Sequence, residues 1–201
     1  MTEPSKWVQI TRSNPDHSTW YVQRFRQMAA AGADLVGEAR LVDALVPRGA
    51  RILDAGCGPG RHGGYLAEAG HEVVGVDVDP VLIEAAQEDF PGATWLVGDL
   101  AELDLPARGI TEPFDAILCA GNVMTFLAES TRVEVLRRMA RHLRADGRAA
   151  IGFGAGRGYA FDDFLADARE GGLVPDLLLS TWDLRPLEET SDFLVAVLRR
   201  G

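Results

Sequence analysis

Three glycines follow directly on a short apolar run in the stretch ILDAGCGPG (residues 52–60). A strand that runs into a glycine turn and then a helix brings backbone N–H groups close to a ligand, because glycine has no side chain to hold the ligand away. The stretch GPGRHG (residues 58–63) matches the G-x-G-x-x-G fingerprint of dinucleotide sites. However, the glycine directly after the apolar run is Gly56, and counting from it places Arg61 at the third fingerprint position. The loop therefore predicts a nucleoside-containing ligand without specifying a dinucleotide.

Acidic side chains lie at the ends of three successive apolar runs. Asp54 lies just before Gly56, where a carboxylate would repel a pyrophosphate but attract an ammonium or sulfonium group. Asp77 ends the next run about twenty residues later, where a carboxylate can accept hydrogen bonds from both ribose hydroxyls. A helix cap is the alternative for Asp77, but Asp79 is better placed for that role. Asp99 ends the third run, where it could accept from an adenine amino group or simply occupy a turn.

These acids can act together only if a sheet brings the ends of separate strands to one edge. The chain alternates between apolar runs and segments with helical spacing, and we expect strands at 50–56, 72–77, 93–99, 114–121, 148–154, 176–184 and 192–200. Helices are expected at 60–69, 80–90, 131–146 and 160–171, the third opened by a capping box of Thr131 and Glu134. Strands without a polar face, separated by helices, indicate a parallel sheet covered on both sides.

The two ends of the chain depart from this alternation. Only a short loop separates the runs at 176–184 and 192–200, so we expect an antiparallel pair, because a parallel crossover needs a dozen or more residues. The last run is apolar on both faces, which places its strand inside the sheet. At the other end, residues 1–16 are expected to form a partly ordered tail. Residues 17–201 are expected to form a single domain, with N-terminal helices over 17–46 that could act as a lid.

This set of motifs resembles the class I S-adenosylmethionine-dependent methyltransferases, from about residue 37 to the C-terminus. ILDAGCGPG resembles the family's first motif, VVGVDVDP its second-strand motif, LVGDL its adenine-binding motif and FDAILCAGNVMTFL its fourth-strand segment. The resemblance implies a doubly wound, Rossmann-like α/β fold of seven strands in the order 3-2-1-4-5-7-6, with strand 7 antiparallel. It implies S-adenosylmethionine as the cofactor. The implied cofactor-binding residues surround the methionine part (Asp54, Gly56, Gly58, Gly60), hold the ribose (Asp77), contact the adenine (Asp99, Leu100) and approach the amino-acid end (Ala120), with Cys57 and Val78 beside them.

The acceptor pocket is expected beyond the fourth and fifth strands. Asn122 could orient an acceptor hydroxyl or amine, or could simply occupy a turn. Tyr159 and Arg157 follow the fifth strand and could close over the pocket, although flexible surface is the expectation for Arg157. Trp20 and Tyr21 could belong to a lid, although aromatic residues at helical spacing are more often core. No catalytic base is identified, and methyl transfer requires one only when the acceptor must lose a proton early.

Composition excludes several classes of partner. The 201-residue chain has 20 Lys and Arg against 30 Asp and Glu, a net charge of −10, whereas nucleic-acid binders usually carry basic patches. No apolar run approaches the roughly 20 residues that span a bilayer, so no membrane partner is expected. The first residues contain no apolar signal-peptide core and there are only two cysteines, which favours a cytoplasmic location. Four scattered histidines, including His62 at a helix start, do not indicate a metal site.

The sequence therefore predicts a methyltransferase that acts on a small molecule. Nearly every residue after Gly49 belongs to the core fold, and none is left for an inserted substrate domain. A non-catalytic S-adenosylmethionine-binding regulatory or partner protein is the alternative, because a binding site can be named and a catalytic residue cannot. An NAD-dependent dehydrogenase has only the fingerprint match in its favour, and Asp54 argues against it. Neither the acceptor nor the oligomeric state follows from the sequence.

Overall fold

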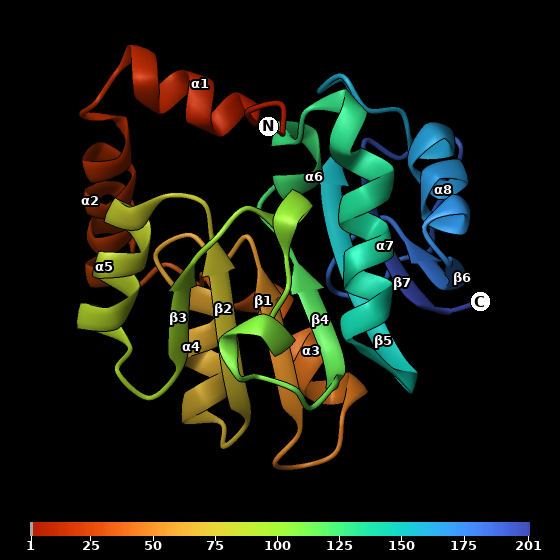
Figure 1. The fold of residues 1–201 in the computed structure, drawn as a ribbon, viewed down its shortest axis with the longest axis horizontal. Coiled ribbons are helices and arrows are strands. Elements are labelled where there is room, and N and C mark those ends of the chain that lie inside the picture. The colour runs from red at the N-terminus through yellow and green to blue at the C-terminus, as the bar shows by residue number, and fades with distance from the viewer. Residues whose placement is uncertain (1) are drawn as a thin grey trace.

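The structure, a computed structural model that describes residues 2–201, is built around one seven-stranded sheet with helices on both faces (Figure 1). The strands are β1 (Arg51–Ala55), β2 (Glu72–Asp77), β3 (Thr94–Val97), β4 (Phe114–Cys119), β5 (Leu143–Gly154), β6 (Leu173–Leu179) and β7 (Phe193–Arg200). Their order is 3-2-1-4-5-7-6. The first five strands pair in parallel, whereas β7 is antiparallel to both β5 and β6. The predicted Rossmann-like fold is confirmed.

The last strand lies inside the sheet, as its apolar sequence predicted. β7 is hydrogen-bonded to β5 on one side and to β6 on the other. With both edges paired and both faces covered, its central side chains have no contact with water, and all five are buried: Leu194, Val195, Ala196, Val197 and Leu198. A strand in this position needs no polar face.

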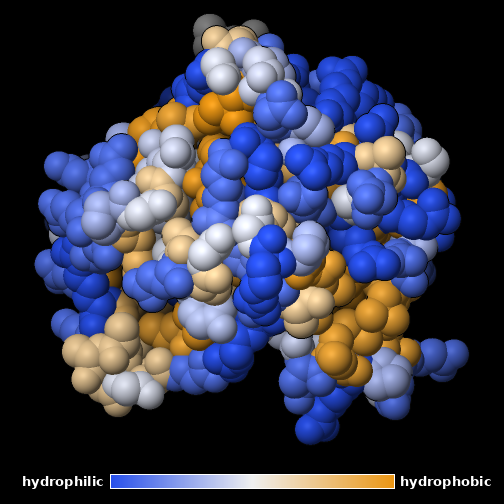
Figure 2. All heavy atoms as spheres, turned by 90° about the horizontal axis from the view of Figure 1, so that it is seen from below, coloured by the Kyte–Doolittle hydropathy of each residue, from blue (hydrophilic) through white to orange (hydrophobic). Residues whose placement is uncertain are grey.

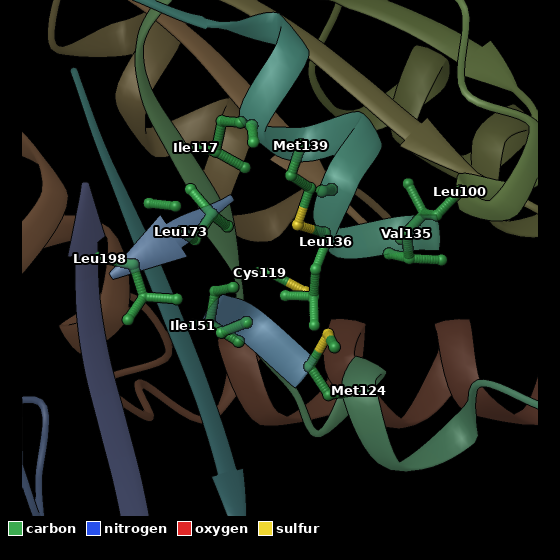
Figure 3. Packing of buried hydrophobic residues seen from close by; sticks show 14 of the residues in the cluster. Leu100, Ile117, Cys119, Met124, Val135, Leu136, Met139, Ile151, Leu173 and Leu198 are labelled. Carbon is green, nitrogen blue, oxygen red and sulfur yellow. The ribbon is translucent and has the colours of Figure 1, made fainter. Parts of the chain in front are cut away.

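The helices form a layer on each face of the sheet and a group near its carboxyl edge. Their bounds are α1 (Lys6–Ser13), α2 (His17–Ala30), α3 (Gly37–Leu45), α4 (Arg61–Glu68), α5 (Pro80–Asp89), α6 (Val123–Phe126), α7 (Arg132–His142) and α8 (Phe161–Glu170), with short 3-10 turns η1 (Leu100–Glu102), η2 (Pro106–Arg108) and η3 (Glu129–Thr131). On one face, α7 packs Leu136 and Met139 against Ile117 and Ile151 of the sheet (Figure 3). α3 and α4 cover the other face.

α7 and β5 meet at a different residue from the one predicted. Thr131 donates its hydroxyl hydrogen bond to the Ala128 carbonyl at 2.8 Å, and Glu134 forms ion pairs within α7, so the predicted capping box does not form. The helix ends at His142, and β5 begins at once with Leu143, which pairs with Phe114 of β4. The buried position of Leu143 explains why the chain becomes extended here rather than continuing as a helix to Gly147.

The N-terminal residues are more regular than the partly ordered tail that was predicted for 1–16. α1 forms there and lies across the side of the sheet to which the carboxyl ends of β1–β4 point (Figure 1).

Figure 2 shows the molecule from the opposite side, where hydrophilic residues dominate and hydrophobic ones occur in scattered patches. No helix within residues 2–201 is long and apolar enough to cross a membrane.

Candidate active site

A cavity of about 490 Å³ lies at the carboxyl edge of the sheet. Its walls come from the loops that follow β1, β2, β3, β4 and β5, and from α1, α2 and α3. This edge, where strand order reverses between β1 and β4, is where open α/β sheets bind ligands. The volume lies within the range of about 300–1,000 Å³ that is usual for small-molecule sites.

The loop after β1 requires glycine at two positions. Gly56 and Gly60 have φ angles of 79° and 82°, in the region that side-chain-bearing residues rarely adopt. A Cβ atom on Gly56 would lie 2.5 Å from the Val123 side chain, and one on Gly60 would lie 2.8 Å from Ala86. Between them, Gly58 lines the cavity with its backbone. The glycines therefore let the chain turn sharply at the strand end and begin α4 directly behind the cavity.

Asp77 ends β2 and lines the cavity. Its two carboxylate oxygens accept hydrogen bonds from the backbone N–H groups of Gly58 at 2.9 Å and Asp79 at 3.0 Å. Burial raises the pKa of Asp77 to about 6, against the opposing effect of these two hydrogen bonds. A carboxylate oxygen has two lone pairs, so each oxygen can accept one further hydrogen bond. The ionised group can thus receive both hydroxyls of a ribose.

Besides Gly56, Gly58 and Asp77, five predicted cofactor residues line the same cavity: Cys57, Val78, Asp99, Leu100 and Ala120. Asp99 accepts a hydrogen bond from the Ala101 N–H at 2.8 Å, which holds its carboxylate at the start of η1. Burial raises the pKa of Cys57 well above the ordinary value for a thiol, so Cys57 is a neutral wall residue. The structure therefore brings the ends of β1, β2, β3 and β4 together as the motifs require.

Asp54 and Gly60 lie behind the cavity instead of in its wall. Asp54 is 1% exposed, and its carboxylate accepts a hydrogen bond at 2.9 Å from the N–H of Gly63 in the first turn of α4. Burial raises the pKa of Asp54, while the nearby His62 and this hydrogen bond act in the opposite direction. A carboxylate is favourable at a helix N-terminus. Asp54 thus supports α4 and the glycine loop from below and does not face the ligand space.

One buried carboxylate joins both N-terminal helices to the wall of the cavity. Trp7 of α1 lines the cavity, and its indole N–H donates to Asp79 at 2.8 Å. Ser18 of α2 donates its hydroxyl to the same oxygen, while the other oxygen caps α5 by accepting from the Val81 N–H at 2.9 Å. Trp7 also packs edge-on against Tyr21, with ring centroids 5.2 Å apart. Asp79 is therefore the cap that the sequence predicted and, in addition, the anchor of α1 and α2.

Two of the four residues predicted for the acceptor pocket line the cavity. Tyr21 lies there on α2, and burial raises its pKa while the charge of Arg61 acts in the opposite direction. Asn122 has a φ of 65°, and its side-chain oxygen accepts from the Gly154 N–H at 2.8 Å. This bond ties the end of β4 to the end of β5, so Asn122 shapes the pocket between the two strands.

The other two predictions, Trp20 and Tyr159, are corrected by the structure. Trp20 is 52% exposed and absent from the cavity wall, because neighbouring positions on a helix point in different directions and Tyr21 takes the inward one. Tyr159 is 3% exposed, and its hydroxyl donates to Asp167 at 2.6 Å. The guanidinium of Arg132 lies 3.9 Å from the centre of its ring. Tyr159 is thus held in the core and does not close over the pocket.

Several residues of the cavity wall were missed from the sequence. Phe193 and Trp182 line the side near β5 and β7. Arg157, which was considered for the pocket but expected to be flexible surface, lines the same side after β5. Phe193 begins the antiparallel strand β7, and an antiparallel strand begins at the edge where its parallel neighbours end. The predicted reversal of the last strand was therefore a signal that could have identified Phe193. Trp182 lies beyond the end of β6 at Leu179, in a loop that was predicted as strand.

A charged group of three side chains forms the wall between α3 and α4. Glu38 lies 3.2 Å from the guanidinium of Arg61 and 3.4 Å from Nε2 of His62. Burial acts to raise the pKa of Glu38, but the neighbouring His62 and Arg61 outweigh it and lower this pKa to about 2. All three side chains line the cavity, and Glu38 is ionised at neutral pH. Glu38 had no role in the sequence analysis.

Comparison with known proteins agrees with this geometry. A family model described as a methyltransferase domain matches residues 52–147. The chain is 55% identical to a TehB-like SAM-dependent methyltransferase of Corynebacterium glutamicum, over 94% of this chain and all of that one. The two structures superpose with a TM-score of 0.88.

Two sequence relatives match shorter parts of the chain. The magnesium-protoporphyrin O-methyltransferase of Rhodobacter capsulatus is 31% identical over 135 residues, or 63% of this chain and 54% of that protein. The trans-aconitate 2-methyltransferase of an Azoarcus species is 32% identical over 139 residues, or 66% of this chain and 50% of that protein. The chain therefore spans about half the length of each of these two relatives.

Proposed function

The chain belongs to the class I S-adenosylmethionine-dependent methyltransferases, and from this premise we propose that it transfers a methyl group from the cofactor to an oxygen, nitrogen or carbon atom of a small molecule. The observation that carries the proposal is the continuity of the cavity at the carboxyl edge of the sheet. Asp77 and Asp99 line one part of it, and Trp182, Phe193 and Arg157 line another. One continuous space therefore has room for a nucleoside and for a second molecule beside it.

The donor and acceptor groups in the wall fit the family's cofactor. Asp77 offers carboxylate lone pairs to the ribose hydroxyls, and Asp99 offers them to the adenine amino group. The apolar walls formed by Val78 and Leu100 suit the flat faces of the base. Within residues 2–201, no group of three or more His, Cys, Asp or Glu side chains is arranged to hold a metal ion, so the proposal involves none.

The protein's part in the reaction is to position the acceptor and exclude water. The cofactor supplies an electrophilic methyl group on a sulfonium, and transfer is an in-line displacement by the acceptor's lone pair. Asn122 and the loop after β4 fix one side of the acceptor space, while Trp182 and Phe193 form an apolar side. Trp7 and Tyr21 cover the cavity from the N-terminal helices. Orienting two reactants in a dry site can account for much of a rate enhancement without a general base.

Three features support a small acceptor over a nucleic acid. The net charge is −10, which disfavours contact with a phosphate backbone. Three of the four arginines of α7 pair with acidic neighbours: Arg132 lies near Glu129, and Glu134 pairs with both Arg137 and Arg138. Helix α1 also lies across the carboxyl edge of the sheet (Figure 1) and contributes Trp7 to the cavity wall, where a small acceptor would be enclosed.

We also propose that the enzyme works in the cytoplasm. Cys57 and Cys119 are both buried and unbridged, and burial raises the pKa of each thiol. Thiols in this state are typical of proteins from reducing compartments.

A turnover assay separates this proposal from its alternative. Transfer of the label from methyl-labelled S-adenosylmethionine would be measured against a panel of small O-, N- and C-nucleophiles, bulk tRNA and unfolded protein. The proposal predicts label transfer to one chemical class of small molecule, and slower transfer by an Asp77→Asn variant when the cofactor concentration is limiting. Transfer only to tRNA or protein would overturn the small-acceptor proposal. Cofactor binding without turnover on any acceptor would favour the non-catalytic binding protein.

A further inference from the structure

The charged group of Glu38, Arg61 and His62 is not accounted for by the fold. Arg61 also donates to the Leu35 carbonyl, which fixes its guanidinium beside the N-terminal end of α3. Its contact with Glu38 is 3.2 Å, and that of His62 is 3.4 Å, whereas charged N–H···O bonds usually measure about 2.7–2.9 Å. The Arg61 and His62 side chains therefore approach Glu38 without closing around it, and the carboxylate retains free lone pairs.

His62 provides a second sign that the group is incomplete. Its side chain is 5% exposed, and Nε2 has no hydrogen-bond partner in the described residues despite its closeness to Glu38. A buried polar atom left without a partner costs about 1–3 kcal/mol, so such atoms usually have one. Because His62 and Glu38 both line the cavity, a polar ligand group in the cavity could complete their hydrogen bonding.

The topology indicates which part of the cofactor reaches this wall. The sheet order places β1 between β2 and β4. A ligand with its ribose on Asp77, at the end of β2, and its adenine over Asp99, after β3, must extend its third part over β1. α4 begins there at Arg61, directly after the glycine loop, and α3 packs beside it. The third part of S-adenosylmethionine is an amino acid that carries an ammonium and a carboxylate.

We propose that the Glu38 carboxylate accepts hydrogen bonds from the α-ammonium group of the cofactor, with Arg61 as the neighbouring positive charge for the cofactor's carboxylate. This inference rests on the proposed function, since it assigns one part of the same cofactor. The sequence indicated Asp54 as the partner of an ammonium or sulfonium group. However, Asp54 is 1% exposed, and its carboxylate already accepts a hydrogen bond from the Gly63 N–H of α4. Glu38, in contrast, lines the cavity and lies 3.2 Å from Arg61, the residue that follows the glycine loop.

The test compares two ligands that differ only where Glu38 would act. S-adenosylhomocysteine carries the amino-acid part, and methylthioadenosine has the same nucleoside and sulfur without it. Calorimetric titration of wild type and Glu38→Gln with both ligands gives four dissociation constants. Because a hydrogen bond to a charged group contributes about 1.5–3 kcal/mol, we expect the variant to bind S-adenosylhomocysteine about ten- to a hundredfold more weakly. Methylthioadenosine should bind the variant and wild type equally well.

Asp43→Asn is the matched control. Asp43 lies on the same helix, and its carboxylate contacts the ring of another buried histidine, His71, at 2.9 Å, but it is outside the cavity wall. This variant should leave both affinities unchanged. As a third ligand, the decarboxylated analogue of S-adenosylhomocysteine keeps the amine, and Glu38→Gln should weaken its binding too.

Three results would overturn the inference. Equal weakening of both ligands by Glu38→Gln would show that Glu38 only supports the wall. Unchanged binding of S-adenosylhomocysteine would show that the ammonium lies elsewhere, while the proposed function would stand. Failure of the wild-type protein to bind S-adenosylhomocysteine at all would overturn the proposed function and this inference with it.

Discussion

Replacement of Asp77 by Asn should weaken cofactor binding. In the ligand-free protein, it should also remove a loss of unfolding free energy that the wild type undergoes as the pH rises to neutral. The ionised carboxylate is the group that can receive both ribose hydroxyls, and each hydrogen bond to a charged acceptor contributes about 1.5–3 kcal/mol. An amide keeps only one acceptor oxygen, which already receives a backbone N–H. We therefore expect S-adenosylhomocysteine to bind the variant at least about tenfold more weakly at neutral pH.

The effect on stability follows from the raised pKa of Asp77. In the folded protein this pKa is about 6, against an ordinary value of 3.8, because the carboxyl group is buried. Well below pH 3.8 the group is protonated in both the folded and unfolded states, and its contribution to stability is fully present. As the pH rises towards 6, the unfolded chain loses its proton first, and the folded protein loses up to about 3 kcal/mol of unfolding free energy. Asn does not titrate and avoids this loss.

Urea unfolding of both proteins near pH 4 and pH 7, without ligand, measures this difference. The free energy of unfolding of the variant, relative to wild type, should rise by up to about 3 kcal/mol between the two pH values. Any backbone hydrogen bond lost in the variant lowers its stability equally at both pH values and cancels in this comparison. An unchanged difference between the two pH values, or normal S-adenosylhomocysteine binding by the folded variant, would refute the reasoning about Asp77.

Three further substitutions distinguish the cavity from the core. Gly56→Ala should lower the free energy of unfolding by about 1–3 kcal/mol in urea titrations, because its φ is 79° and a Cβ would overlap a neighbouring side chain. Trp7→Phe removes the indole hydrogen bond that holds α1 over the cavity, so S-adenosylhomocysteine should dissociate severalfold faster in stopped-flow measurements. Tyr159→Phe removes a core hydrogen bond and should lower the unfolding free energy by about 1 kcal/mol without changing S-adenosylhomocysteine affinity.

Each of these predictions has a control or a result that contradicts it. Gly109 has a φ of 82° but open surroundings, so Gly109→Ala should cost less than Gly56→Ala, and an equal cost would show that crowding at Gly56 is unimportant. Trp20→Phe, at an exposed position of α2, should not alter the dissociation rate. If Trp20→Phe raises the dissociation rate as strongly as Trp7→Phe does, the anchoring role of Trp7 is wrong. Loss of cofactor binding in a folded Tyr159→Phe variant would show that Tyr159 does contribute to the cofactor site.

The parts of the site that were predictable are those fixed by local sequence. Glycines after an apolar run and an acid at the end of the next run identified the loop at Gly56 and the position of Asp77, because both depend on strand ends that a short pattern reveals. The order of the strands came from the family resemblance, since alternation alone does not determine it. The reversal of the last strand was readable because its connection is too short for a parallel crossover.

The parts that were missed depend on contacts between residues far apart in the chain. Trp7 reaches the cavity because of its bond to Asp79, and nothing in the polar N-terminal sequence indicates that partner. Tyr159 looked like a loop residue, yet Arg132 and Asp167 hold it in the core. Glu38 lies on an amphipathic helix, where a charged residue normally faces water, and only the packing of α3 on α4 turns it towards the cavity.

A crystal structure of the protein with S-adenosylhomocysteine tests the central claim, that this cavity is the cofactor site, most directly. We expect the ribose hydroxyls within hydrogen-bonding distance of Asp77, the adenine beside Asp99 and Leu100, and the amino-acid part over the glycine loop. Trp7 should cover the bound nucleoside. Electron density for the ligand at another place, or with its adenine on the side of Trp182 and Phe193, would contradict the account.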